Sequence, residues 1–220
     1  MRQTQKQQRA LAVLQRLKAV YPAAPCSLNF ETPLQLMIAT MLAAQCTDER
    51  VNKVTPALFE RYPTVEAFAQ AELGELENYV KSTGFYRNKA KNIRLNCQRL
   101  IEVYGGEVPQ TMADLVSLAG VARKTANVVL AHGFGINGGV TVDTHVKRIS
   151  NLLKLTKSDN PVQIERDLMK LLPQPDWENW SIRLVYHGRE TCIARRPQCD
   201  RCPIFEFCPS GPKLLAGKNL

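Results

Sequence analysis

Apolar residues recur every three or four positions through most of the 220-residue chain, which places them on one face of successive helices. The period-two alternation that marks half-buried strands is hard to find. The sequence therefore predicts an all-α fold of about ten helices. Thr32 followed by Pro33 marks one helix start. The expected helices are 11–17, 32–44, 48–62, 75–83, 88–105, 111–118, 123–135, 143–155, 160–172 and 178–192.

Four glycines fall within the eight residues GFGINGGV, 133–140, between the earlier and the later helices. Glycine-rich segments of this kind interrupt helices and connect larger structural parts. We therefore expect the chain to cross here from one helical lobe to another. The helix before the crossing, 123–135, is apolar over most of its circumference, which indicates a central, buried helix.

The chain is strongly basic, with 29 Lys and Arg against 20 Asp and Glu and a formal net charge of +9. This balance favours a polyanionic partner such as nucleic acid, although a basic globular protein without one is the alternative. The N-terminus lacks the apolar core of a signal peptide, and the longest apolar stretch, LMIATMLAA, is too short to cross a bilayer. We expect an intracellular protein that does not bind membranes.

Four of the seven cysteines fall within 17 residues near the C-terminus, in the pattern C-x6-C-x2-C-x5-C. Four thiolates can bind one zinc ion or one iron–sulfur cluster. Zinc sites more often pair two short C-x2-4-C steps, and only one short step exists here, so we favour a [4Fe-4S] cluster over zinc or no metal. The expected ligands are Cys192, Cys199, Cys202 and Cys208.

Two arginines, Arg195 and Arg196, lie between the first two of these cysteines. Because ligands on either side fix the loop, it can hold both cations toward DNA phosphates. The alternative is a solvated pair of charges.

The segment LVSLAGVARKTANVV, 115–129, has the pattern of a helix, a short glycine-containing turn and a second helix. Backbone amides at the start of the second helix can bind an anion. Arg123 and Lys124 lie at this positive helix end, where each cation costs about 0.3–1 kcal/mol. A bound phosphate would compensate that cost, although any helical hairpin can share this pattern.

Several motifs together give a specific resemblance. The segments LAGVARKTANVVL (118–130) and VDTHVKR (142–148), followed by the cysteine pattern, resemble the endonuclease III family of helix-hairpin-helix DNA glycosylases. MLAAQCTDERVNK (41–53) and TGFYRNKAKNI (83–93) look like the DNA-probing loops of that family. The order and spacing of the motifs match over nearly the whole chain.

The resemblance implies a bifunctional DNA glycosylase and apurinic/apyrimidinic lyase that acts on oxidised or saturated pyrimidines in double-stranded DNA. It implies a six-helix barrel over residues 26–136 and an iron–sulfur domain formed by 1–25 and 137–220, with the active site in the cleft between them. We expect a monomer in the cytoplasm, associated with the nucleoid through DNA.

By motif position, Lys124 is the catalytic nucleophile and Asp143 the essential carboxylate. A lysine amine can attack C1′ and form a Schiff base, from which the 3′ phosphate leaves by β-elimination. A carboxylate nearby stabilises the positive charge that develops on the sugar. Asp143 also precedes THVKRI, where it would serve as a helix N-cap, and both roles are compatible.

The remaining DNA-probing assignments rest on the resemblance. Gln45 is expected to fill the gap left by the extruded base and Phe85 to wedge the opposite strand. Judged from the sequence alone, Gln45 would be a hydrogen-bonding loop residue and Phe85 a core residue. Asp48 either caps a helix or also lines the base pocket, and His145 either orients a group beside Asp143 or is structural.

The hairpin departs from the L-P-G-V-G pattern of the family, because Ala119 replaces the proline and Ala122 the second glycine. If position 122 requires a positive φ, alanine there costs around 1 kcal/mol. We expect phosphate binding by Gly120, Ala122 and Arg123 to survive, because Gly120 is retained at the turn.

Three rival functions remain. A catalytically silent DNA-binding protein and an iron–sulfur redox sensor tethered to DNA are both disfavoured by the presence of Lys124 and Asp143. An adenine or thymine glycosylase is the nearer alternative, but these relatives lack a lysine at the hairpin position.

Overall fold

The computed structural model describes residues 4–23 and 25–217, which form helices, turns and loops and contain no strand. The predicted all-α class is confirmed. The chain divides into two compact units with separate hydrophobic cores. We call Cys26–Gly138 the central unit, and Met1–Pro25 together with Gly139–Leu220 the terminal unit.

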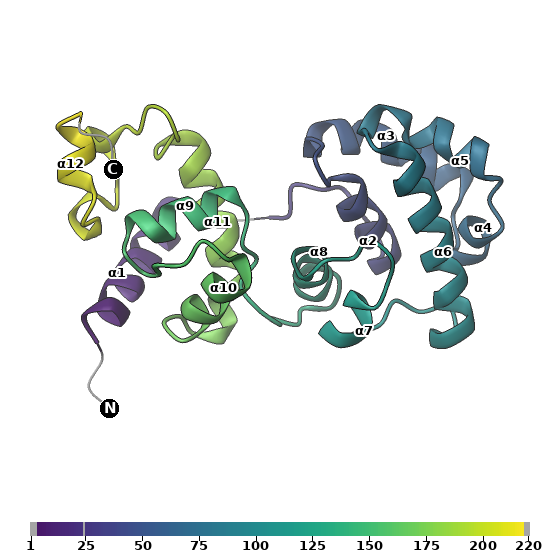
Figure 1. The fold of residues 1–220 in the computed structure, drawn as a ribbon, viewed down its shortest axis with the longest axis horizontal. Helices are drawn as coiled ribbons and strands as arrows, with labels where there is room; N and C mark the ends of the chain where they lie inside the picture. Colours follow the sequence, from purple (N-terminus) through teal and green to yellow (C-terminus); the bar gives the residue numbers. More distant parts are fainter. Residues whose placement is uncertain (1–3, 24, 218–220) are drawn as a thin grey trace. The chain divides into compact units, whose positions relative to one another are not determined.

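The central unit packs its helices around α2, whose residues from Leu36 to Leu42 are all buried. The long helix α6 lies against α4 and α5 (Figure 1). The elements are α2 (Pro33–Leu42), α3 (Asp48–Arg61), α4 (Val65–Ala69), α5 (Leu73–Val80), a 3-10 turn (Lys81–Thr83), α6 (Tyr86–Tyr104), α7 (Met112–Val116), α8 (Arg123–Val128) and a π-helical turn (Val129–Gly133).

Local signals account for several helix ends in this unit. Thr32 caps α2 by accepting a hydrogen bond from the Gln35 amide at 3.2 Å, and Pro33 is the first helical residue, as predicted. Gly105 ends α6 with φ 62°, a left-handed conformation that glycine adopts readily. The helix predicted over 123–135 is present as the α-helix Arg123–Val128, which continues without a break as the π-helical turn Val129–Gly133.

The terminal unit is built around α11, which packs against α1 and α9 (Figure 1). Trp180 on α11 is fully buried, and Leu14 and Leu17 of α1 join the same core. The elements are α1 (Gln5–Val20), α9 (Thr144–Leu152), α10 (Pro161–Met169), a 3-10 turn (Gln174–Asp176), α11 (Trp177–Glu190), 3-10 turns at Cys199–Arg201 and Phe205–Phe207, and α12 (Gly211–Leu215).

The sequence did not predict the five-residue helices α4 and α12. Each spans little more than one helical turn. None of the helices in the described ranges combines the length and the apolar character needed to cross a membrane.

Candidate DNA-contacting and catalytic residues

The turn between α7 and α8 has a geometry that only glycine fits at its centre. Gly120 has φ 73°, and a β-carbon there would lie 2.6 Å from Nδ2 of Asn92 on α6. Val121, the next residue, is 5% exposed and anchors the turn in the hydrophobic core. The turn is therefore fixed from inside while Gly120 itself stays at the surface.

A second asparagine of α6 holds the residue before this glycine. The Ala119 amide donates to Oδ1 of Asn96 at 2.7 Å, and Nδ2 of Asn96 donates to the Ala119 carbonyl at 2.9 Å. Asn96 is 1% exposed, so these bonds satisfy an amide that would otherwise be buried unpaired. A proline at 119 has no N–H, so the first bond depends on the residue that departs from the family pattern.

Position 122 does not need glycine. Ala122 has φ −83° and ψ 166°, an extended conformation that any residue can adopt. The destabilisation expected for alanine at a position with positive φ therefore does not arise. It precedes α8 without a side-chain capping bond. Arg123 and Lys124 follow on the first turn of α8, and both side chains are exposed.

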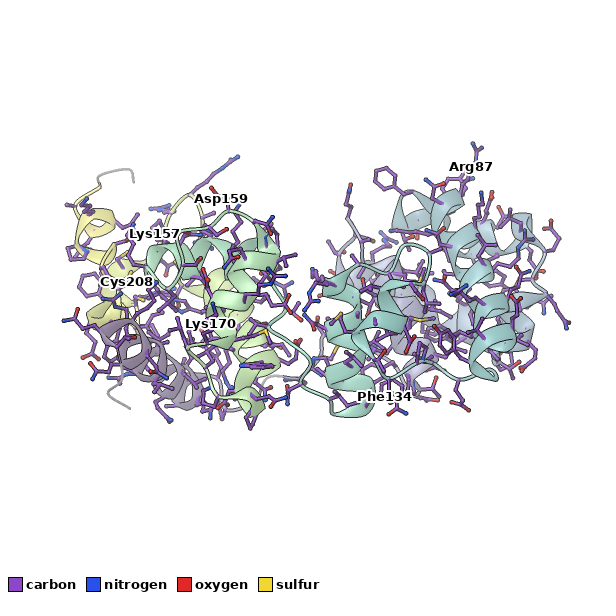
Figure 2. All side chains as sticks on the ribbon, turned by 60° about the horizontal axis from the view of Figure 1, so that its bottom comes forward. Arg87, Phe134, Lys157, Asp159, Lys170 and Cys208 are labelled. Carbon is purple, nitrogen blue, oxygen red and sulfur yellow. The ribbon has the colours of Figure 1, made fainter. Side chains whose placement is uncertain are left out.

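The two expected DNA-probing residues share an unusual backbone conformation. Gln45, after α2, has φ 55°, and Phe85, before α6, has φ 47°. A left-handed conformation costs a non-glycine residue about 1–2 kcal/mol, and such strain concentrates at functional sites. Phe85 is 64% exposed, so its alternative as a core residue is wrong. Figure 2 shows Arg87 projecting outward from the same end of α6.

Asp48 is the first residue of α3, and the cap itself is Thr47, whose hydroxyl accepts from the Arg50 amide at 3.3 Å. The alternative of Asp48 as the helix cap is therefore wrong. Instead, the Asp48 carboxylate accepts a hydrogen bond from the Ser27 hydroxyl at 2.7 Å. This bond joins the start of α3 to the first residues of the central unit. The role of Asp48 in lining the base pocket stays a prediction.

Asp143 is the N-cap of α9, as predicted. Its Oδ1 atom accepts from the Val146 amide at 2.8 Å. The preceding segment is fixed to α11, because the Thr141 hydroxyl donates to the buried Glu178 carboxylate at 2.7 Å. The Asp143 carboxylate is thus held by the Val146 amide, the segment before it is anchored to α11, and Asp143 itself stays partly exposed. Its catalytic role stays a prediction.

His145, the second residue of α9, packs tightly against α11. A β-carbon at Gly188 would overlap the Nδ1 atom of His145, so the two helices approach closely only because residue 188 is glycine. Burial, assisted by the charges of Arg148 and Arg189, lowers the pKa of His145, and Asp143 acts in the opposite direction. The close packing of His145 against Gly188 helps to set the position of the α9 N-terminus.

The four C-terminal cysteines line a single cavity, together with Ile149 and Leu152 of α9 and Leu153, which follows the helix. All are free thiols, and Cys208 lies on the C-terminal segment (Figure 2). Four cysteine sulfurs surrounded by apolar side chains are a donor set that an iron–sulfur cluster accepts, so the residues present fit a [4Fe-4S] cluster.

Two side chains contact the cysteine sulfurs in this cavity. Arg148 donates to the Cys192 sulfur at 3.3 Å and to its carbonyl at 2.6 Å. The Nε2 atom of His187 lies 3.7 Å from the Cys202 sulfur. Burial raises the pKa of Cys202 to about 11, so the cluster must displace a proton from this thiol when it binds. In this donor set, the cluster would be held by Cys192, Cys199, Cys202 and Cys208.

Arg195 and Arg196 are both exposed in the loop between the first two of these cysteines. The Arg196 amide donates to the Ile193 carbonyl at 3.3 Å, which closes a turn that presents the arginines to solvent. This position suits a contact with phosphate, and the contact stays a prediction.

Comparisons with known proteins now define the class. Residues 38–174 match the model of the HhH-GPD superfamily of base excision DNA repair proteins, and residues 192–208 match the iron-sulfur binding domain of endonuclease III. The chain is 62% identical over 205 residues to endonuclease III of Synechocystis sp., which covers 93% of this chain and 94% of that protein. It is 43% identical to endonuclease III of Bacillus subtilis over 91% of each chain.

Solved structures give the same result. A structure of a non-covalent endonuclease III–DNA complex matches with a TM-score of 0.90 and 42% identity, covering 97% of this chain and all of that one. A thermostable thymine-DNA glycosylase matches with a TM-score of 0.84 but only 19% identity, which shows the common fold alone. The chain belongs to the HhH-GPD superfamily, and within it to the endonuclease III family. It is accordingly a base-excision-repair DNA glycosylase and AP lyase that binds a [4Fe-4S] cluster.

The hairpin geometry generates the first prediction. Ala119→Pro removes the amide that donates to Asn96 and should cost about 1–3 kcal/mol of unfolding free energy, because a buried acceptor loses its partner. Adding Asn96→Val removes that acceptor, so the double variant should lose less than the sum of the single losses. Urea denaturation of the four proteins measures this coupling. Stabilisation by Ala119→Pro would instead show that a rigid turn outweighs the hydrogen bond.

The cysteine cavity generates the second prediction. The purified protein should contain about four irons and four sulfides per chain. Cys202→Ala should lose them, whereas Cys97→Ala should retain them, because Cys97 is buried in the other core. Metal and sulfide analysis after anaerobic purification makes the comparison. Stoichiometric zinc in the wild-type protein would contradict the assignment.

Proposed function

We propose that the protein excises oxidised or saturated pyrimidines from double-stranded DNA and cleaves the resulting abasic site through a Schiff base on Lys124. The observation that supports this proposal most directly is the exposed Lys124 on the first turn of α8. It follows a turn that Val121 anchors in the core and that Asn96 holds through two hydrogen bonds to Ala119. A trapped covalent endonuclease III–DNA intermediate, from a protein 42% identical to this one, supports a covalent mechanism.

The chemistry assigns one role to each residue. As the glycosidic bond breaks, its electron pair leaves with the base, and the neutral Lys124 amine bonds to C1′. Asp143 stabilises the positive charge that develops on the sugar during this step. Loss of the amine proton and opening of the ring give an imine. Removal of a C2′ proton then expels the 3′ phosphate, and water releases the lysine.

Several other residues are assigned to DNA. Gly120, Ala122 and Arg123 face phosphates at the hairpin, and Arg195 and Arg196 do so from the cysteine loop, in line with the net charge of +9. Gln45 fills the gap left by the base, and Phe85 wedges the opposite strand, which its exposure permits. Asp48 lines the base pocket.

We further propose that the protein acts as a monomer in the cytoplasm, bound to the nucleoid. Residues 26–136 serve as the six-helix barrel, and residues 1–25 with 137–220 as the iron–sulfur domain. An adenine or thymine glycosylase is the nearest rival. Excision from duplexes that carry thymine glycol, a mismatch or an abasic site distinguishes these activities.

Borohydride trapping tests the nucleophile. Wild-type protein should form a stable adduct with an abasic duplex, because borohydride reduces the imine. Lys124→Gln should lose the adduct and strand cleavage. It should still bind damaged DNA within about tenfold of wild type, since one exposed charge contributes about 1 kcal/mol. An undiminished adduct in Lys124→Gln would assign the nucleophile to another amine.

Asp143→Asn separates base excision from strand cleavage. It should lose most excision, where cationic charge must be stabilised, yet keep more activity on a preformed abasic site, whose glycosidic bond is already gone. Asparagine can still cap α9, so the free energy of unfolding should change by only a few tenths of a kcal/mol. Equal loss of both activities would make Asp143 a proton acceptor for Lys124.

A further inference from the structure

A buried lysine connects the two segments that carry Gln45 and Phe85. Lys89 lies on the core-facing side of α6 and is 7% exposed. Its Nζ atom donates to the Leu42 carbonyl at 2.7 Å and to the Thr83 carbonyl at 2.8 Å. One side chain therefore joins the end of α2 to the turn that precedes α6.

Both acceptors lie just before a strained residue. Leu42 is the last residue of α2, three positions before Gln45, and Thr83 is two positions before Phe85. Carbonyls at helix ends lack intrahelical partners, so they are available to an ammonium group. The backbone amide of Lys89 also donates to the Phe85 carbonyl at 3.1 Å. The lysine thus contacts the backbone of both segments, the one that carries Gln45 and the one that carries Phe85.

The acceptor at Thr83 is itself fixed. Thr83 is 1% exposed, and its hydroxyl donates to the Val80 carbonyl at 2.8 Å. Burial lowers the pKa of Lys89, so the ammonium depends on these carbonyls to replace water. A side chain of similar length without donors would fill the space but leave both carbonyls unpaired.

We propose that Lys89 is a positioning residue that holds the Gln45 and Phe85 loops in one fixed arrangement, so that gap filling and strand wedging occur together when the base leaves the stack. The inference rests on the DNA-probing roles assigned to these two residues in the proposed function. It adds a residue that touches neither DNA nor the reacting atoms.

The test compares Lys89→Met with Lys91→Met, which removes an exposed lysine from the same helix. Each protein is measured by single-turnover excision of thymine glycol from a duplex and by borohydride trapping on a single-stranded abasic oligonucleotide. A duplex with 2-aminopurine opposite the lesion reports base unstacking.

Lys89→Met should lower the rate of duplex excision by about tenfold to a hundredfold, as expected for misplaced contacts, and should reduce the 2-aminopurine fluorescence signal. Trapping on single-stranded DNA should change by less than about twofold, because no base stack must open.

Gln45→Ala and Phe85→Ala complete the design. With Lys89 present, each substitution should lower the rate of duplex excision. The Gln45→Ala/Phe85→Ala double variant should lose less than the product of the two single fold-reductions in rate. In Lys89→Met the two effects should become independent. Lys91→Met should retain the wild-type pattern.

Three results would overturn the inference. Lys89→Met could lower duplex excision and single-stranded trapping equally, in proportion to a lower folded fraction, which would make the lysine merely structural. Lys89→Met could leave unchanged both the rate of duplex excision and the non-additive effect of Gln45→Ala with Phe85→Ala. That result would refute the inference while the proposed function stands. If Gln45→Ala and Phe85→Ala have no effect in the wild-type background, their assigned roles in the proposed function fail, and the inference fails with them.

Discussion

The central unit depends on polar side chains of α6 that reach backbone groups of other segments. Lys89 donates to two carbonyls in the buried interior, and the buried Asn96 side chain exchanges two hydrogen bonds with the half-buried Ala119. An unpaired buried amide or ammonium group would be costly, so each of these residues favours one arrangement of the loop it contacts. The same helix that fills the core through Ile93 and Leu100 thereby sets the positions of three surface loops.

This arrangement explains how strained conformations persist at the surface. Gln45, Phe85 and Gly120 all have positive φ, and each lies within three residues of a backbone group held by α6. Glycine accepts this conformation at little cost, whereas the other two residues must be stabilised by their surroundings. Backbone strain at these two positions is therefore offset inside the fold, which leaves their side chains available to a ligand.

The terminal unit fixes its own candidate residue by a different route. Asp143 caps α9, and Thr141 binds Glu178 on α11 two residues earlier. The other end of the same helix borders the cysteine cavity, where Arg148 contacts Cys192. One helix thus connects the carboxylate to the cluster ligands, so a bound cluster would stabilise the element that positions Asp143.

The sequence predicted the elements that depend on local patterns. Apolar spacing gave most helices, Thr32 with Pro33 gave the start of α2, and a glycine gave the end of α6. It did not predict the π-helical turn after Val128 or the exposure of Phe85, because both depend on tertiary packing. The roles of Lys89 and Asn96 were also missed, since the sequence does not show which distant backbone group a polar side chain will bind. The available signal was the position of these two polar residues on the apolar stripe of α6, beside Ala90, Ile93, Cys97 and Leu100.

The departure at Ala119 shows why such positions must be interpreted with their partners. Replacing proline by alanine makes a turn more flexible in the unfolded chain, which by itself costs about 0.4–1 kcal/mol. The same replacement restores an N–H group, and in this chain Asn96 accepts from it at 2.7 Å. One hydrogen bond of this kind contributes about 0.5–1.5 kcal/mol, and without it the buried Asn96 oxygen would be unpaired, so the bond outweighs the flexibility that alanine introduces. The hairpin can therefore retain its rigidity through a side chain of α6, 23 residues earlier in the chain.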